Sequence, residues 1–153
     1  MAIPYWDWSE TGLRAARIAG AYLLSLPIGW SWEKIRHNTG LRTFPLVSIA
    51  SCCYVLVARK AFGAAVISDD HILQGLMTGI GFIGGGAIFT QGVKVHGTAA
   101  AASIWCIGAL GAAVGYGAYD IAILLAVVNF LTLHMLRPLK ESLDQFPAER
   151  DGD

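Results

Sequence analysis

Residues 98–119 read TAAAASIWCIGALGAAVGYGAY, a run of 22 residues without a charged side chain. A transmembrane helix needs about 20 mainly apolar residues, so this run is long enough to cross a bilayer. Small residues recur four positions apart in Gly108/Ala112 and Gly111/Gly115, which places them on one side of a helix. The run therefore predicts a membrane-spanning helix that packs closely on a neighbour.

Four more apolar runs accompany it: Leu13–Trp30, Thr43–Val57, Gly75–Thr90 and Ile121–Leu136. The second run is short, but it is long enough to cross the bilayer if it is extended to Leu41–Phe62 and its terminal Arg and Lys side chains reach the two interfaces. We therefore expect an all-α, polytopic transmembrane bundle of about five helices, with glycine-rich third and fourth helices. Residues 1–137 would form this domain, and 138–153 a short polar cytoplasmic tail.

The composition agrees with lipid as the solvent. Hydrophobic residues make up 55% of the chain and charged residues only 14%, with a net charge of zero. Without an excess of basic residues, nucleic-acid binding is disfavoured. The three cysteines lie in apolar runs without a C-x-x-C spacing, so we interpret them as packing residues. No catalytic or metal-binding pattern occurs, and we expect neither an enzyme nor a cofactor.

Aromatic and basic residues predict the orientation. Trp8 and Trp30 are 22 residues apart, about 33 Å along a helix, and such aromatic clusters favour the two membrane interfaces. Six Lys and Arg residues lie on the side of the 31–42 loop, the 91–97 loop and the C-terminus, against two to four on the other. This bias predicts a cytoplasmic C-terminus and an outer N-terminus, with Arg14 and Arg17 as interfacial residues.

The segment Gly79-Ile80-Gly81-Phe82-Ile83-Gly84 matches the dinucleotide fingerprint G-x-G-x-x-G, but without its strand and later acid. We interpret it as helix packing instead, because Gly75/Gly79 and Gly81/Gly85 are also small residues four apart. The third and fourth helices would then pack on each other or across a homo-oligomer. The alternative for Gly84, Gly85 and Gly86 is an unwound helix that turns carbonyls toward an ion.

Several segments together resemble one family: Thr39-Gly40-Leu41-Arg42-Thr43, Gln74 four residues before Thr78, Gly79–Ile88, and Gly97 followed by Ala101-Ala102-Ser103-Ile104-Trp105. The pattern is similar to the MgtC/SapB family of bacterial membrane proteins over about residues 12–137. At the end of the first apolar run, where many members have G-L-E-R-E, residues 29–33 keep only the glycine and Glu33.

The resemblance implies a bacterial inner-membrane protein of about five helices, and a short member without the soluble C-terminal domain of longer ones. Longer members are linked to growth under magnesium limitation, and some are held to restrain the ATP synthase. Magnesium transport by the family is not established. The family-motif positions are Arg17, Thr43, Phe82, Gly97 and Trp105.

Ionisable residues at membrane depth are costly, so each is a candidate site. Arg42 is an interfacial anchor, or a partner for Glu33 or a phosphate group. Asp70 and Gln74 share a helix face, where Asp70 caps the third helix or attracts a cation. His134 is interpreted as an interhelical hydrogen-bonding residue that shares no site with Asn129.

Two functions remain open. The first is a regulatory or structural membrane module that acts through helix contacts, with a second copy or another membrane protein as partner. The second is a small channel or transporter for an ion or solute, for which Asp70, Gln74 and the three consecutive glycines provide the candidate path.

Overall fold

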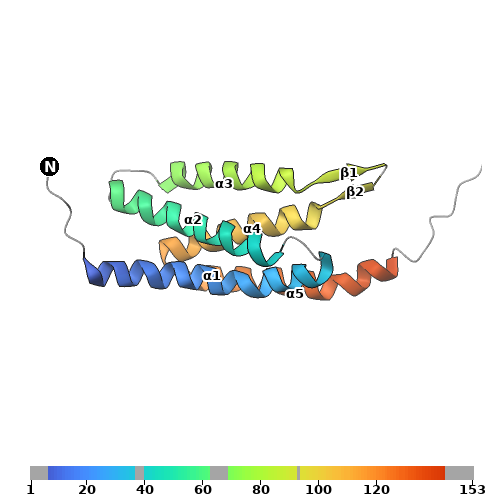
Figure 1. The fold of residues 1–153 in the computed structure, drawn as a ribbon, viewed down its shortest axis with the longest axis horizontal. Helices are drawn as coiled ribbons and strands as arrows, with labels where there is room; N and C mark the ends of the chain where they lie inside the picture. The colour runs from blue at the N-terminus through green and yellow to red at the C-terminus, as the bar shows by residue number, and fades with distance from the viewer. Residues whose placement is uncertain (1–6, 37–39, 63–68, 93, 144–153) are drawn as a thin grey trace, which may run out of the picture.

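The computed structural model describes residues 7–36, 40–62, 69–92 and 94–143 as an up-and-down helical bundle with one short hairpin (Figure 1). The elements are α1 (Trp8–Arg36), α2 (Gly40–Phe62), α3 (Asp69–Gly86), β1 (Phe89–Gln91), β2 (Lys94–His96), α4 (Thr98–Tyr116) and α5 (Tyr119–Leu143). Successive helices run in opposite directions, so α1 begins at one end of the bundle and α5 ends at the other.

The five helices confirm the expected all-α fold class. Within the described residues, three of these helices are long and apolar enough to cross a membrane, over Gly40–Ala61, Thr98–Tyr116 and Tyr119–Leu136. The helix α5 continues past the expected domain boundary at residue 137 to Leu143, and residues 144–153 of the expected tail lie outside the described residues.

The helix α4 lies at the centre of the bundle and contacts the other four helices. Its side chains Ile107, Leu110 and Val114 are almost fully buried and form the middle of the hydrophobic core. In contrast, α3 packs mainly on α4, touches α2 only slightly and lies at the outer side of the bundle (Figure 1). Apolar side chains of α5 face outward, as expected for a helix whose solvent is lipid.

The third apolar run does not form one helix up to Thr90, as the sequence alone suggested. The helix α3 ends at Gly86, and the chain continues into an antiparallel hairpin in which Phe89 pairs with His96. Three consecutive glycines stabilise a helix poorly, whereas the following isoleucine, phenylalanine and threonine favour extended backbone. The hairpin is completed by Gly92, whose φ of 63° suits glycine.

Candidate functional site

The glycines of α4 lie at close helix contacts. A Cβ at Gly111 would overlap the Ser48 carbonyl oxygen of α2, and one at Gly115 would lie 2.8 Å from the Val55 side chain. A Cβ at Gly108 would overlap Ile80 of α3. Gly111 and Gly115 therefore allow the backbone of α2 to approach α4, and Gly108 leaves room for the Ile80 side chain of α3.

The glycines of α3 differ from one another. Gly84 lies against α4, where a Cβ would be 3.4 Å from the Ala101 carbonyl oxygen, and Gly81 lies near the Trp105 indole. At Gly75, Gly79, Gly85 and Gly86, no described atom outside the helix's own backbone would lie within 4 Å of a Cβ. We call Gly75 and Gly79 the open glycine face of α3. The run Gly84–Gly86 forms the end of α3 and not a break within it.

Glu33 and Arg42 occupy the end of the bundle where α1 ends and α2 begins. The Glu33 carboxylate accepts hydrogen bonds from the backbone N–H groups of Gly40 (3.2 Å) and Leu41 (3.3 Å), which caps α2. The Arg42 side chain is exposed, and no ion pair between it and Glu33 occurs in the described part of the chain. The interfacial-anchor interpretation of Arg42 therefore fits the geometry better than the ion-pair interpretation.

Asp70 and Gln74 lie at the opposite end, on the first turns of α3, and both are exposed. Gln74 accepts a hydrogen bond from Thr78 through its backbone carbonyl (2.8 Å). Within the described residues, no group of three or more His, Cys, Asp or Glu side chains has the arrangement needed for a metal ion. The structure thus separates the four candidate polar residues into two pairs at the two ends of the bundle.

Arg17, which we expected to be an interfacial residue, lies beside the last turn of α4, at the end of one candidate membrane span. It is partly buried, and its Nη1 donates a hydrogen bond to the Gly115 carbonyl oxygen of α4 at 2.9 Å. The carbonyls in the last turn of a helix lack partners within it, so an arginine is favourable there. The expected ion pair between Arg14 and Glu10 is present.

Arg59 of α2 is a residue whose role the sequence analysis missed. Its guanidinium lies 5.1 Å from the centre of the Tyr116 ring, a cation–π arrangement, next to the contact of Arg17 with Gly115. Because α1 and α2 are antiparallel, the beginning of α1 and the end of α2 must meet at one end of the bundle. That rule could have indicated the arrangement from the sequence.

A second polar contact is buried between α1, α4 and α5. The Trp32 indole donates to the Ser103 hydroxyl (3.2 Å), which donates to the Asn129 side-chain oxygen (3.4 Å). Trp32 therefore faces the interior of the bundle. His134 is exposed and stacks on Phe130 of its own helix, so the interhelical hydrogen bond expected for it is absent from the described residues.

The other family-motif positions have different environments. Phe82 is 85% exposed and Trp105 is 51% exposed, whereas Thr43 is partly buried. Gly97 precedes α4 with a φ of 87°, and a Cβ there would overlap the Ala87 carbonyl oxygen. Only glycine suits this position, because both the backbone conformation and the space exclude a side chain.

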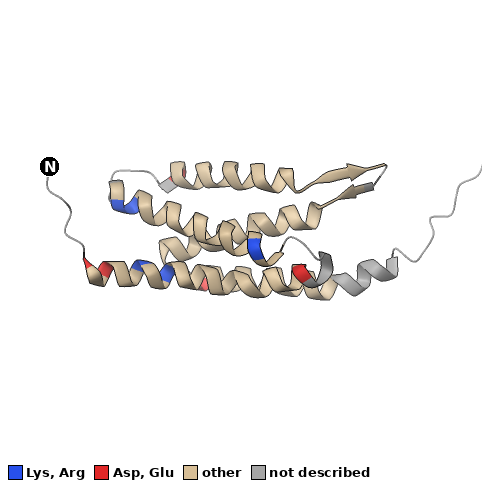
Figure 2. Cartoon of the chain, in the orientation of Figure 1, with Lys and Arg blue, Asp and Glu red and all other residues tan. Residues whose placement is uncertain are grey.

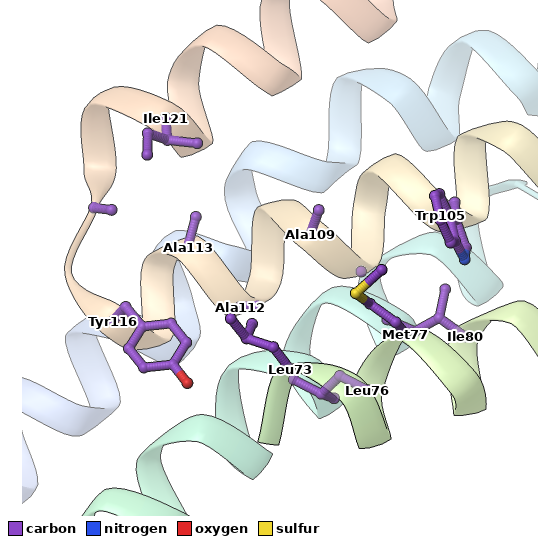
Figure 3. A pocket seen from close by; sticks show the side chains of 12 residues that line it. Leu73, Leu76, Met77, Ile80, Trp105, Ala109, Ala112, Ala113, Tyr116 and Ile121 are labelled. Carbon is purple, nitrogen blue, oxygen red and sulfur yellow. The ribbon is translucent and has the colours of Figure 1, made fainter. Parts of the chain in front are cut away.

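An open apolar pocket of about 360 Å³ lies between α3, α4 and α5 (Figure 3). Leu73, Leu76 and Met77 of α3 line it together with small α4 side chains, and Trp105 and Tyr116 lie toward its two ends. Such a lining suits an acyl chain or the side chains of another helix. It offers no ligands for an ion.

Comparison with known proteins shows the family to which this chain belongs. The sequence matches the MgtC family over residues 18–142, which is most of the chain. The chain belongs to the MgtC family. This membership confirms the resemblance described above and makes the chain a membrane protein. The MgtC match includes α2 to α4 and nearly all of α5, and it begins one residue after Arg17.

MgtC relatives are similar along most of the chain. Protein MgtC of Brucella abortus is 35% identical over 146 residues, which cover 95% of this chain and 60% of the relative. Protein SrpB of Synechococcus elongatus is 32% identical over a region that covers 90% of this chain and 81% of the relative. The protein of Escherichia coli K12 described as putative magnesium transporter YhiD is 33% identical over a region that covers 73% of this chain and 55% of the relative.

The chain thus spans about 60% of the length of the Brucella relatives of the MgtC family. No solved structure matches the chain.

Proposed function

We propose that this MgtC family member is a regulatory or structural module of the bacterial inner membrane that acts through helix–helix contacts. The open glycine face of α3 carries the proposal, because no described atom outside the helix's own backbone occupies the space beside Gly75 and Gly79. Lipid provides no hydrophobic drive for helix association, so small residues that permit close backbone contact favour it. A face of this kind suits another transmembrane helix better than it suits lipid.

The partner proposed for this face is a second copy of the chain, with another membrane protein as the further candidate. The relatives named MgtC and the family's link to magnesium limitation support a role in adaptation to low magnesium or in the control of membrane energetics. For the orientation, we propose a cytoplasmic C-terminus and an outer N-terminus, as the Lys and Arg bias predicts. A reporter fused after Asp153 would be active on the cytoplasmic side, and a periplasmic signal would contradict the orientation.

The association is tested with two differently tagged copies expressed together. We expect the parent copies to co-purify, and Gly79→Leu to reduce co-purification severalfold because leucine holds the backbones apart. The matched control is Gly12→Leu, since Gly12 on α1 also has no described atom within 4 Å of a Cβ. Equal co-purification by both variants would contradict the proposed interface. Restored growth at low magnesium, by the parent but not by Gly79→Leu, would link the interface to the physiological role.

The alternative is a small ion or solute conductor. An open groove of about 470 Å³ between α2 and α3 favours it, because Ser51, Tyr54 and His71 contribute polar groups to the lining. The relative described as a putative magnesium transporter points the same way.

Asp70→Asn distinguishes the two functions. Asp70 is exposed on the first turn of α3 and asparagine has nearly the same shape, so the variant is expected to fold normally, but it lacks the charge that would attract a cation. We expect liposomes with the parent or with Asp70→Asn to take up no cations above protein-free liposomes. Cation uptake that requires the parent and is abolished by Asp70→Asn would favour the conductor.

A further inference from the structure

Where α1 begins and α2 ends, basic residues surround a pocket of about 320 Å³. We call it the basic pocket; it is lined by Glu10, Leu13, Arg14, Arg17, Leu56, Arg59 and Lys60. Figure 2 shows the basic positions of both helices at this end of the bundle. Four cations and one carboxylate line the pocket, and the carboxylate already pairs with Arg14. Arg17, Arg59 and Lys60 have no carboxylate partner among the residues that the structure describes.

The two central arginines are held in place by the last turn of α4. Arg17 donates to the Gly115 carbonyl oxygen, and the Arg59 guanidinium lies over the Tyr116 ring. Both side chains therefore keep a fixed position without a negatively charged partner. A site with its cations already positioned loses little conformational entropy when an anion binds.

Each of these arginines also has an unused donor. The Nε atoms of Arg17 and Arg59 are buried and have no hydrogen-bond partner within the described part of the chain. Arg17 and Arg59 lie where two candidate membrane spans, Gly40–Ala61 and Thr98–Tyr116, end, and an uncompensated cation next to lipid is costly. A buried charged donor without an acceptor is unfavourable, and a negative charge bound in the pocket would lower the cost of keeping the two cations there.

The chemistry of the lining indicates which anion fits. Guanidinium groups match phosphate oxygens in charge and in planar geometry, and basic pockets between transmembrane helices suit lipid headgroups. Leu13 and Leu56 place apolar surface beside the cations, which suits a phosphate attached to a glycerol and acyl chains. We propose that the basic pocket binds the phosphate of an anionic phospholipid headgroup. The excess of positive charge selects such a lipid over a zwitterionic one.

The test measures lipid binding to the purified full chain in detergent. Phosphatidylglycerol and phosphatidylcholine are titrated separately, and bound lipid is followed by native mass spectrometry and thermal unfolding. We expect phosphatidylglycerol to bind more tightly, and Arg59→Gln combined with Lys60→Gln to weaken it about tenfold or more. The control is Arg42→Gln, which removes an exposed cation at the other end of the bundle and is expected to leave binding unchanged.

Three results would overturn the proposal: equal binding of the two lipids, an equal loss in Arg42→Gln, or unchanged binding in the double variant. The effect of inorganic phosphate on thermal unfolding is measured in a separate experiment. If millimolar phosphate stabilises the parent as strongly as phosphatidylglycerol, and the double variant loses both effects, the pocket binds a free oxyanion and the lipid assignment is wrong. If the double variant does not fold, Lys60→Gln alone decides the question, with an expected loss of about fivefold, because the Lys60 side chain is exposed.

Discussion

The contacts of α4 with α2 and the open groove between α2 and α3 use the same residue type in opposite ways. At Gly111 and Gly115, glycine lets two backbones meet, and any side chain would collide with α2. At Gly75 and Gly79, the same spacing leaves the surface open. A small residue four positions from another therefore does not tell whether its partner lies within the chain. The position of the helix in the bundle decides whether such a residue packs on a helix of the same chain or leaves an open surface.

The largest expected effect comes from Gly111→Ala. A methyl group there would overlap the Ser48 carbonyl oxygen, and backbone cannot move aside as a flexible side chain can. We expect destabilisation of about 1–3 kcal/mol or more, measured by unfolding of the purified protein in detergent.

The matched control is Gly79→Ala, which meets nothing within 4 Å among the described atoms. Alanine is the better helix former by about 1 kcal/mol, so this variant is expected to be as stable as the parent or slightly more stable. Equal destabilisation of the two variants would remove the distinction between the two regions.

A smaller effect is expected where the packed region also uses hydrogen bonds. Ser103→Ala deprives both the Trp32 indole and the Asn129 oxygen of a partner, at a cost of about 1–3 kcal/mol. Ser31→Ala is the control, because the Ser31 hydroxyl bonds only to the Pro27 carbonyl of its own helix among the described residues. If both variants unfold under the same conditions, the buried contact does not stabilise the packing of α1 on α4.

The smallest effect concerns Asp7, which lies outside both regions and caps α1. Hydrogen bonds from the Ser9 hydroxyl and then from the backbone N–H groups of Glu10 and Ser9 hold the pKa of Asp7 below its usual value. A lowered pKa means that the cap is fully present above the pKa of the unfolded chain and is lost as the pH falls through the folded pKa. We expect the first turn of α1 to loosen only below about pH 4.

This titration can be followed through the NMR signal of the Ser9 amide. Asp7→Asn keeps the cap but removes the charge, so its Ser9 signal is expected not to change over the same pH range. A titration that persists in Asp7→Asn would assign the effect to another group.

Much of the architecture followed from the sequence, because length and hydropathy determine which segments can cross a membrane. Five apolar runs corresponded to five described helices, and Gly108, Gly111 and Gly115 lie at helix contacts. The hairpin between α3 and α4 was missed because its isoleucine, phenylalanine and threonine continue the apolar run, and hydropathy does not separate helix from strand. The three glycines before it were the available signal.

The candidate sites were harder to predict, since a side chain's direction depends on the neighbouring helix. The sequence did not predict that Arg17 donates a hydrogen bond to a carbonyl in the last turn of α4. Glu33 was considered as a partner for Arg42, yet the nearby N-terminus of α2 offers two backbone donors. In both cases a helix end provides the partner, and helix ends meet only in three dimensions.

The contact between Gly29 and Gly40 has a consequence for the order of assembly. The two backbones meet so closely that a Cβ on either glycine would collide with the other helix, and Glu33 caps α2 at the same turn. Only ten residues lie between the two glycines, so little chain entropy opposes their meeting. Both helices of this pair are complete before α4 has been synthesised. The first two helices can therefore close as a hairpin during synthesis, leaving α4 to dock afterwards against a preformed surface.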